Sequence, residues 1–183
     1  MDILVNNAGI TRHARDHSDL DALSKDDFLD TYAVNVVGPY LMLQATKPLL
    51  EAAYRTTGRA STVLNTSSIA GIQGIGSSVA YAASKGGLLM FMKSLAQEVA
   101  HQKIRVNAIS PGAIRTDINR SAWETPEAEA DLLRLIPYER VGDPMDIGHV
   151  AVWLASDASD YVTGTTIYAD GGMTLYPGFR EGG

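Results

Sequence analysis

The sequence predicts an α/β fold in which a parallel sheet carries helices on both faces. Short apolar runs rich in β-branched residues are typical of strands buried on both sides, and they occur near residues 2–6, 62–66, 104–109 and 165–169. Segments with apolar residues at helical spacing lie between these runs, near residues 25–54, 78–100 and 143–154. This alternation favours parallel strands joined by helices, and an antiparallel sheet or a helical bundle would contradict it.

Length and composition fit one globular domain with a substantial core. The chain has 183 residues, of which 45% are hydrophobic and 20% are charged. Its formal net charge of −6 argues against nucleic acid or an anionic membrane surface as a partner. The absence of cysteine excludes disulfides and thiolate zinc sites, and the sequence shows neither a signal-peptide pattern nor an 18-residue apolar run. Composition therefore predicts a cytoplasmic protein without nucleic-acid or membrane partners.

The first expected strand, Ile3–Val5, ends in the small, turn-tolerant residues Asn6–Gly9. Such residues let a backbone come close to a ligand, although a simple strand-ending turn explains them equally well. Residues 10–23 are polar and lack apolar periodicity, so we expect a loop. Its potential metal ligands are His13, Asp16 and His17. A loop without a further ligand cluster is a poor metal site, and we assign no metal.

A helix should begin after Ser24, which forms a capping-box pattern with Asp27. Gly38-Pro39 should bend this helix, with Asn35 just before the bend. The glycines of residues 71–76 follow the second strand and resemble a phosphate-binding loop. Such a loop opens a helix directly, whereas the next helix here begins only near Ser78. The segment is therefore predicted to be a flexible loop over the substrate.

Residues able to do acid–base chemistry are concentrated between Ser68 and Lys85. Tyr81 and Lys85 are four residues apart, so on a helix they project from one face. A phenol has a pKa near ~10, and a cation within ~4–6 Å can lower the pKa of a neighbouring acid by roughly 1–3 units. Ser68 would add a hydrogen bond to the same substrate oxygen. The pattern indicates a site that oxidises an alcohol, although this Tyr–Lys spacing also occurs by chance.

The second half of the chain continues the alternation of strands and helices. The helix near 78–100 carries an apolar stripe that suits a core or a subunit contact. Pro111–Thr116 ends the third strand, and the polar, acidic residues 117–140 suit a mobile lid that contacts the substrate. Asp143-Pro144 begins the last helix. Asp170–Gly172 turns the chain out of the last strand.

Four blocks together resemble the signature of the short-chain dehydrogenase/reductase family. In chain order they are Asp2–Gly9, Val63–Ser68 with Ala80–Leu88, Arg105–Thr116, and Val162–Gly172. The resemblance covers nearly the whole chain. It implies a Rossmann-like doubly wound parallel sheet, reduced here to the strands after the third. It also implies an NAD(P)-dependent oxidoreductase that interconverts a secondary alcohol or sugar hydroxyl and its carbonyl.

The resemblance also assigns roles to individual residues. Ser68 would position the substrate oxygen, Tyr81 would transfer the proton, and Lys85 would lower the tyrosine pKa and hold the ribose. Asn35 would complete a water relay, unless it is simply tolerated at the kink. The residues implied in binding NAD or NADP are Asn7, Ala8, Gly9, Tyr81, Lys85, Pro111, Gly112, Ile114 and Thr116. The choice between the two dinucleotides cannot be made from this sequence.

The family's glycine-rich fingerprint is absent from the sequence. We therefore expect residues 1–183 to form the C-terminal part of a single domain, through a fragment or a misplaced start, and to be inactive alone. The tail from Asp170 resembles bacterial glucose 1-dehydrogenases, whereas the upstream half resembles 3-oxoacyl-carrier-protein reductases. The substrate should be a small alcohol, sugar or ketone. The family also implies a homodimer or homotetramer through the helices near 25–54 and 78–100. The alternative is an inactive fragment that acts as a dimerising or binding module.

Overall fold

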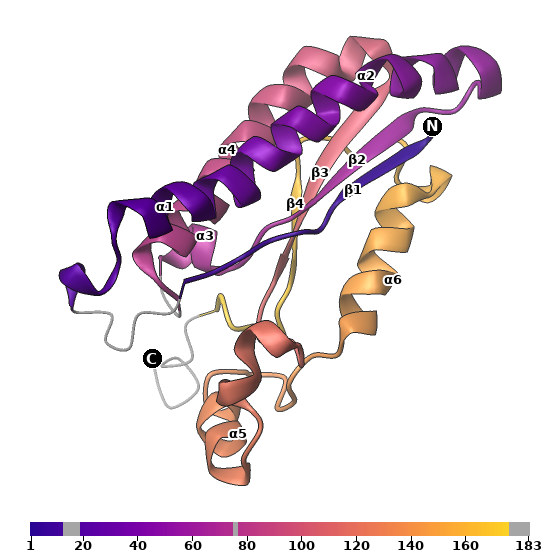
Figure 1. Cartoon of the computed structure of the whole chain (residues 1–183). Helices are drawn as coiled ribbons and strands as arrows, with labels where there is room; N and C mark the ends of the chain where they lie inside the picture. The colour runs from indigo at the N-terminus through magenta and orange to yellow at the C-terminus, as the bar shows by residue number, and fades with distance from the viewer. Residues whose placement is uncertain (13–18, 75–76, 176–183) are drawn as a thin grey trace.

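The computed structural model describes residues 1–12, 19–74 and 77–175. Its centre is a parallel four-stranded sheet with the strand order β1-β2-β3-β4 (Figure 1). The strands are Ile3–Asn6, Ser61–Thr66, Ile104–Pro111 and Thr166–Ala169. The predicted α/β fold with parallel strands is confirmed. All strands run in one direction, so their carboxyl ends share one edge of the sheet.

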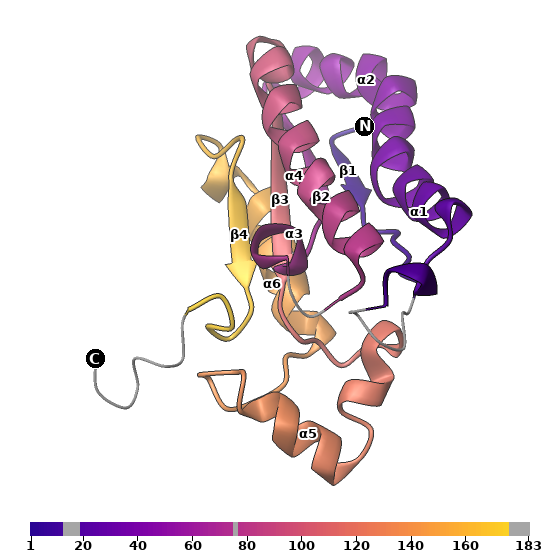
Figure 2. The same cartoon turned by 90° about the vertical axis from the view of Figure 1, so that its left-hand side faces the viewer.

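Helices cover both faces of this sheet, with α1, α2 and α4 on one face and α6 on the other (Figure 1). Their bounds are α1 Lys25–Tyr32, α2 Gly38–Thr57, α3 Ala70–Gln73, α4 Val79–Val99, α5 Pro126–Leu133 and α6 Pro144–Ala155. A π-helical segment, η2, spans Ala33–Val37. Short 3-10 turns are Leu20–Ala22, Ala100–Gln102, Asp117–Ala122 (η4) and Asp157–Ser159. Figure 2 shows α5 beyond the carboxyl ends of the strands.

The two central strands, β2 and β3, contribute side chains to the core on both faces of the sheet, because successive side chains along a strand point to opposite faces. Val63 and Val106 pack with Leu50 and Met92 beneath α2 and α4. Leu64 and Ile109 pack with Leu154 of α6. Burying each such side chain contributes about 1.5–3 kcal/mol. This two-sided packing fixes the carboxyl edge of the sheet.

Among the described residues, no helix is long and apolar enough to cross a lipid bilayer.

The helix predicted to bend near residue 38 contains an irregularity there. Pro39 lies in the first turn of α2, and the residues before it are helical too, so its missing N–H removes a possible bond to the preceding turn. The irregularity is the π-helical segment η2 just before it, and this segment buries Asn35. The capping box of Ser24 and Asp27 forms as predicted, with both hydrogen bonds present. π-Helical turns inside α-helices are rare and are frequent at functional sites.

One loop prediction is wrong, and the structure adds detail to two others. Residues 71–73 are not a flexible loop, because they belong to α3, which packs closely against α4. Residues 117–140, the expected mobile lid, contain η4 and α5, and their mobility stays a prediction. The expected loop at 10–23 includes a 3-10 turn at Leu20–Ala22. The residues of that loop that were considered and rejected as metal ligands, His13, Asp16 and His17, lie outside the described residues.

Candidate active site

Ser68, Tyr81 and Lys85 lie together at the carboxyl edge of the sheet. Ser68 follows the end of β2, and its side chain is hydrogen-bonded to that of Tyr81. Tyr81 and Lys85 are one turn apart on α4, and Lys85 Nζ lies 5.6 Å from the centre of the Tyr81 ring. Ser78 caps the helix and accepts a hydrogen bond from Tyr81 N at 3.4 Å. The end of β2 positions the hydroxyl of Ser68, and the capped first turns of α4 position the phenol and the amine beside it.

The phenol of Tyr81 is held in its protonated form at neutral pH. Burial raises the pKa of Tyr81, and the hydrogen bond from Ser68 acts in the opposite direction. A buried, protonated phenol hydrogen-bonded to a hydroxyl can give a proton to an oxygen bound between the two groups. The expected lowering of the tyrosine pKa by Lys85 stays a prediction.

Lys85 is a buried amine, with 3% of its surface exposed. Its Nζ donates a hydrogen bond of 2.7 Å to the carbonyl of Thr66, the last residue of β2. Burial lowers the pKa of Lys85 from 10.5 to about 8, because the charged form loses its hydration. The amine is therefore still mainly an ammonium at neutral pH. An ammonium carries three donor hydrogens, so two remain for other partners.

The depressed pKa of Lys85 predicts a specific dependence of stability on pH. Between pH 8 and 10.5 the unfolded chain binds more protons at this residue than the folded chain does. The free energy of unfolding should therefore rise with pH in this window by up to about 3 kcal/mol, relative to Lys85→Met. Chemical denaturation of both proteins at several pH values checks this. Measurements should stop below pH 10, where ionisation of Tyr81 begins to contribute. Parallel stability curves would contradict the assignment.

Asn35 connects three parts of the site. Its Nδ2 donates to the Ile10 carbonyl at 2.9 Å and to Ser84 Oγ at 2.9 Å, while its Oδ1 accepts from Ile10 N at 2.9 Å. Ser84 in turn donates to the carbonyl of Tyr81 at 2.7 Å. Both amide hydrogens of Asn35 are thus used within the protein. Its side chain joins the segment after β1 to the turn that carries Tyr81, whereas the expected water relay stays a prediction.

The segment after β1 places Gly9 beside the amine. A Cβ atom at Gly9 would lie 3.2 Å from Lys85 Nζ and 3.4 Å from Asn35 Oδ1. Asn7 is fixed nearby, because its Oδ1 accepts from Thr66 Oγ1 at 3.0 Å, and Ala8 between them is exposed. The backbone of Gly9 therefore approaches the amine more closely than a residue with a side chain could. Holding the ribose of a dinucleotide, the role that the family resemblance implies for Lys85, stays a prediction.

The loop after β3 adjoins the segment that carries Ser68. Ile69 N, directly after Ser68, donates to the Pro111 carbonyl at 3.1 Å, and Gly112 N donates to the Ala169 carbonyl at 3.1 Å. The expected cofactor-binding residues of this loop are Pro111, Gly112, Ile114 and Thr116, and all four lie at the same edge of the sheet. Ile114 is buried. Strand pairing of β2 with β3 thus brings the two predicted groups of residues to one place.

Sequence reasoning missed two buried serines that support the site. Ser67 Oγ donates to the carbonyl of Lys85 at 3.1 Å, and Ser84 links Asn35 to Tyr81. Ser84 is one turn from Tyr81, which is a signal that sequence spacing contains. The contact of Ser67 joins residues 18 positions apart and has no such local signal.

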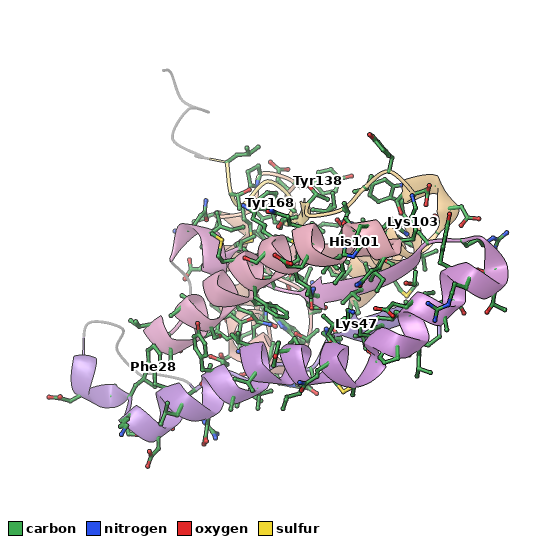
Figure 3. The ribbon with its side chains drawn as sticks, turned by 90° about the horizontal axis from the view of Figure 1, so that it is seen from above. Phe28, Lys47, His101, Lys103, Tyr138 and Tyr168 are labelled. Atoms are coloured by element: carbon green, nitrogen blue, oxygen red, sulfur yellow. The ribbon has the colours of Figure 1, made fainter. Side chains whose placement is uncertain are left out.

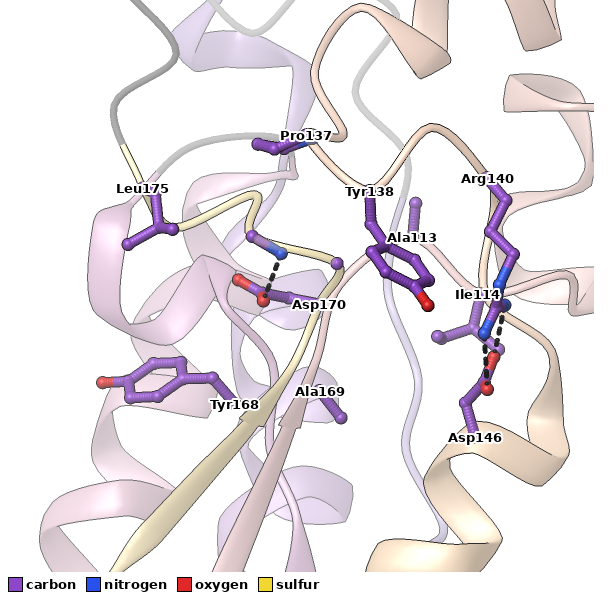
Figure 4. A pocket seen from close by; sticks show the side chains of 13 residues that line it. Ala113, Ile114, Pro137, Tyr138, Arg140, Asp146, Tyr168, Ala169, Asp170 and Leu175 are labelled. Atoms are coloured by element: carbon purple, nitrogen blue, oxygen red, sulfur yellow. Dashed lines mark hydrogen bonds and ion pairs between the residues drawn. The ribbon is translucent and has the colours of Figure 1, made fainter. Parts of the chain in front are cut away.

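A cavity of about 600 Å³ is distinct from this group, since none of the three residues lines it (Figure 4). It lies at the ends of β3 and β4, and Tyr138, Tyr168 and Leu175 form much of its apolar wall. Arg140 and Asp146 pair through bonds of 2.7 and 2.8 Å, and the carboxylate of Asp170 accepts from backbone amides. The side chains of Arg140, Asp146 and Asp170 thus bond to other groups of the protein, and the cavity is also lined by the phenols of Tyr138 and Tyr168. No cluster of potential metal ligands occurs within residues 1–12, 19–74 and 77–175.

Comparisons with known proteins match nearly the whole chain. The family model described as Enoyl-(Acyl carrier protein) reductase matches residues 1–174. The 3beta-hydroxysteroid dehydrogenase 1 of Eggerthella lenta is 58% identical over 102 residues, which are 56% of this chain and 39% of that protein. The 3-oxoacyl-[acyl-carrier-protein] reductase FabG of Chlamydia trachomatis is 38% identical over 174 residues, which are 94% of this chain and 65% of the reductase.

Solved structures agree with these sequence matches. The NADP complex of RhlG from Pseudomonas aeruginosa superimposes with a TM-score of 0.87 at 34% identity. The superposition covers 96% of this chain and 67% of RhlG. The present chain therefore spans about two thirds of the length of these two proteins, FabG and RhlG.

Proposed function

Because the chain belongs to the short-chain dehydrogenase/reductase family, we propose that it carries the acid–base site of an NAD(P)-dependent oxidoreductase that interconverts a secondary alcohol and its carbonyl. The observation that carries the proposal is the grouping of Ser68, at the end of β2, with Tyr81 and the buried amine of Lys85, which lies 5.6 Å from the centre of the Tyr81 ring. The Rossmann-like arrangement of the parallel sheet agrees with the likeness to RhlG.

The residues divide the chemistry as follows. Ser68 and Tyr81 hold the substrate oxygen by hydrogen bonds. In the reducing direction Tyr81 donates its proton to the carbonyl oxygen, and in the oxidising direction its phenolate takes the proton from the hydroxyl. Lys85 stabilises the phenolate through its positive charge. A bound nicotinamide supplies or accepts the hydride. By the family resemblance, Asn7, Gly9, Lys85 and the loop from Pro111 to Thr116 would hold that cofactor. In support, the Gly9 backbone lies close to the amine, and both Asn7 and Lys85 bond to Thr66 at the end of β2.

A ketone or ring hydroxyl is favoured as the substrate over glucose. The two relatives described above are named for a steroid hydroxyl and a 3-oxoacyl group, and the hydroxysteroid dehydrogenase is the more identical of the two. The tail that suggested a glucose 1-dehydrogenase extends past residue 175, beyond the described residues.

We expect the 183-residue polypeptide by itself to bind NAD or NADP only at about millimolar concentration or more weakly. Its sequence contains no glycine-rich turn opening a helix, where a pyrophosphate would bind to free amides. Each missing charge-assisted bond costs roughly 1.5–3 kcal/mol. Calorimetric titration with each dinucleotide measures the affinity. Micromolar binding with turnover of a hydroxysteroid or a 3-oxoacyl ester would contradict this expectation.

A chimera tests the catalytic proposal separately from cofactor affinity. Residues 1–183 would follow the nucleotide-binding units of a related reductase, and the product would be assayed with the same two substrates. Turnover that depends on Tyr81 would support the proposed function. Tight dinucleotide binding without turnover would instead favour the alternative of an inactive binding module.

We also propose that a second copy of the chain covers the outer faces of α2 and α4, which lie side by side when seen from above (Figure 3). These faces expose large apolar side chains, Tyr40, Leu41, Met42, Leu49 and Met90. Leu41 is 53% exposed and Met90 is 63% exposed. Such a group of exposed apolar side chains on two neighbouring helices is typical of an isologous apolar interface.

Light scattering at micromolar concentration should show a dimer or tetramer. Leu41→Glu with Met90→Glu should dissociate it, whereas Leu135→Glu, at an exposed leucine near α5, should not. A monomeric parent would refute the interface.

A further inference from the structure

Ser84 is a fully buried serine on α4, between Tyr81 and Lys85. The family resemblance assigns it no role in the chemistry. Its Oγ donates to the carbonyl of Tyr81 at 2.7 Å and accepts from Asn35 Nδ2 at 2.9 Å. A buried hydroxyl with both partners supplied by the protein needs no water. Ser84 thus stands between the residue that carries the phenol and the asparagine of the π-helical segment.

The direction of each hydrogen bond follows from the hydrogens available. The Ser84 hydroxyl has one hydrogen, and the Tyr81 carbonyl, which can only accept, takes it. Oγ therefore turns a lone pair toward Asn35, whose Nδ2 gives its other hydrogen to the Ile10 carbonyl. Ile10 N in turn donates to Asn35 Oδ1. The donors thus point one way, from the segment after β1 to α4, and bonds in such a series strengthen one another.

Both ends of this series of bonds lie close to Lys85. The Tyr81 carbonyl lies one helical turn before Lys85, and in a regular α-helix it accepts from the amide of that residue as well. At the other end, an ideal Cβ atom on Gly9 would lie 3.2 Å from Lys85 Nζ and 3.4 Å from Asn35 Oδ1. Ser84 therefore joins the helix that carries the amine to the segment that lies beside the amine.

We propose that Ser84 is a positioning residue of the acid–base site, which acts through Asn35 and sets the distance between α4 and the segment after β1. Without its hydroxyl, Asn35 Nδ2 keeps a buried hydrogen that has no acceptor, which is costly. The two elements then move apart, and the amine of Lys85 is displaced from the substrate oxygen. The inference rests on the proposed function, because that proposal places the substrate oxygen beside Tyr81.

The first test needs no ligand and compares Ser84→Ala with Ser84→Thr, which keeps the hydroxyl. In the parent chain both hydrogens of Asn35 Nδ2 are buried and bonded. In Ser84→Ala the NMR signal of the hydrogen without an acceptor should move upfield and exchange with solvent about tenfold faster, since exchange follows local opening. Ser84→Thr should match the parent. Identical Asn35 side-chain signals in the parent and in Ser84→Ala would overturn the inference.

The second test measures kcat and KM of the chimera. Ser84→Ala should lower kcat about tenfold and change KM by less than about twofold, because a small displacement of catalytic groups affects the reaction more than substrate binding. Ser84→Thr should restore most of the lost kcat. The matched control is Ser61→Ala, which removes a fully buried hydroxyl that has no hydrogen-bond partner within the described residues. Its kcat should equal that of the parent.

A double-mutant cycle separates positioning through Asn35 from a general loss of stability. In Asn35→Ala the bond to Ser84 is already lost, so adding Ser84→Ala should change kcat by less than about twofold. A further tenfold loss, to about a tenth of kcat, would overturn the inference, because Ser84 would then act independently of Asn35. Unchanged kcat in Ser84→Ala alone would overturn it and leave the proposed function intact. A chimera without any turnover would overturn the proposed function and the positioning role together, while the ligand-free spectra would still report the hydrogen bond.

Discussion

Tyr81→Phe is expected to lower kcat of the chimera by about 10³-fold while changing KM little, since general acid–base catalysis typically contributes about 10²–10⁴-fold. The substitution removes one oxygen and keeps the ring. The partly buried ring therefore keeps its place beside Lys85, and the position of the amine is preserved. What is lost is the proton that a carbonyl oxygen must receive as the hydride arrives.

The matched control is Tyr40→Phe, which removes a phenolic oxygen from an exposed tyrosine on α2. Its turnover should equal that of the parent. Ser68→Ala should also reduce kcat, because the hydroxyl that bonds to the phenol is gone. Near-normal turnover in Tyr81→Phe would show that another group supplies the proton, and the assignment of Tyr81 would be wrong.

The parts of the fold that sequence predicted well are those governed by local pattern. The four strands and the helix containing Tyr81 follow from periodicity and from start signals such as Ser78 and Ser24. The π-helical segment around Asn35 could not be foreseen in this way. It has no local sequence signature, and its form follows from bonds to Ile10 and Ser84, which are distant in the chain.

The candidate site shows the same division. The spacing of Tyr81 and Lys85 is local, and it was sufficient to place both groups together. The low pKa of Lys85 depends instead on burial, which arises from strand pairing and helix packing. The catalytic and cofactor-binding roles of these residues stay predictions until variants are assayed.

Gly71 shows most clearly how the fold restricts the sequence beside the site. Its backbone contacts that of α4, because a Cβ atom here would lie 2.6 Å from the carbonyl carbon of Lys85 and 2.7 Å from Gly86 N. These are backbone atoms, so neither can rotate away. The glycines of residues 71–76, first interpreted as a sign of flexibility, thus include one that permits close packing of two helices.

Gly71→Ala is therefore expected to destabilise the protein by about 2–3 kcal/mol, the upper part of the usual cost of overpacking. With a urea m-value of about 2 kcal/mol/M, the midpoint of unfolding should fall by about 1 M. The same substitution should lower kcat of the chimera, because separating α3 from α4 displaces Lys85, and a shift of about 1 Å can cost roughly 10²-fold.

Gly148→Ala in α6 is the matched control. Its Cβ would meet only the flexible end of Met145, at 3.7 Å or more. Alanine is favoured over glycine inside a helix by about 1 kcal/mol, so this variant should be neutral or more stable. Equal urea midpoints for the two variants would show that α3 yields without strain, and the close contact between Gly71 and Lys85 would not govern the site.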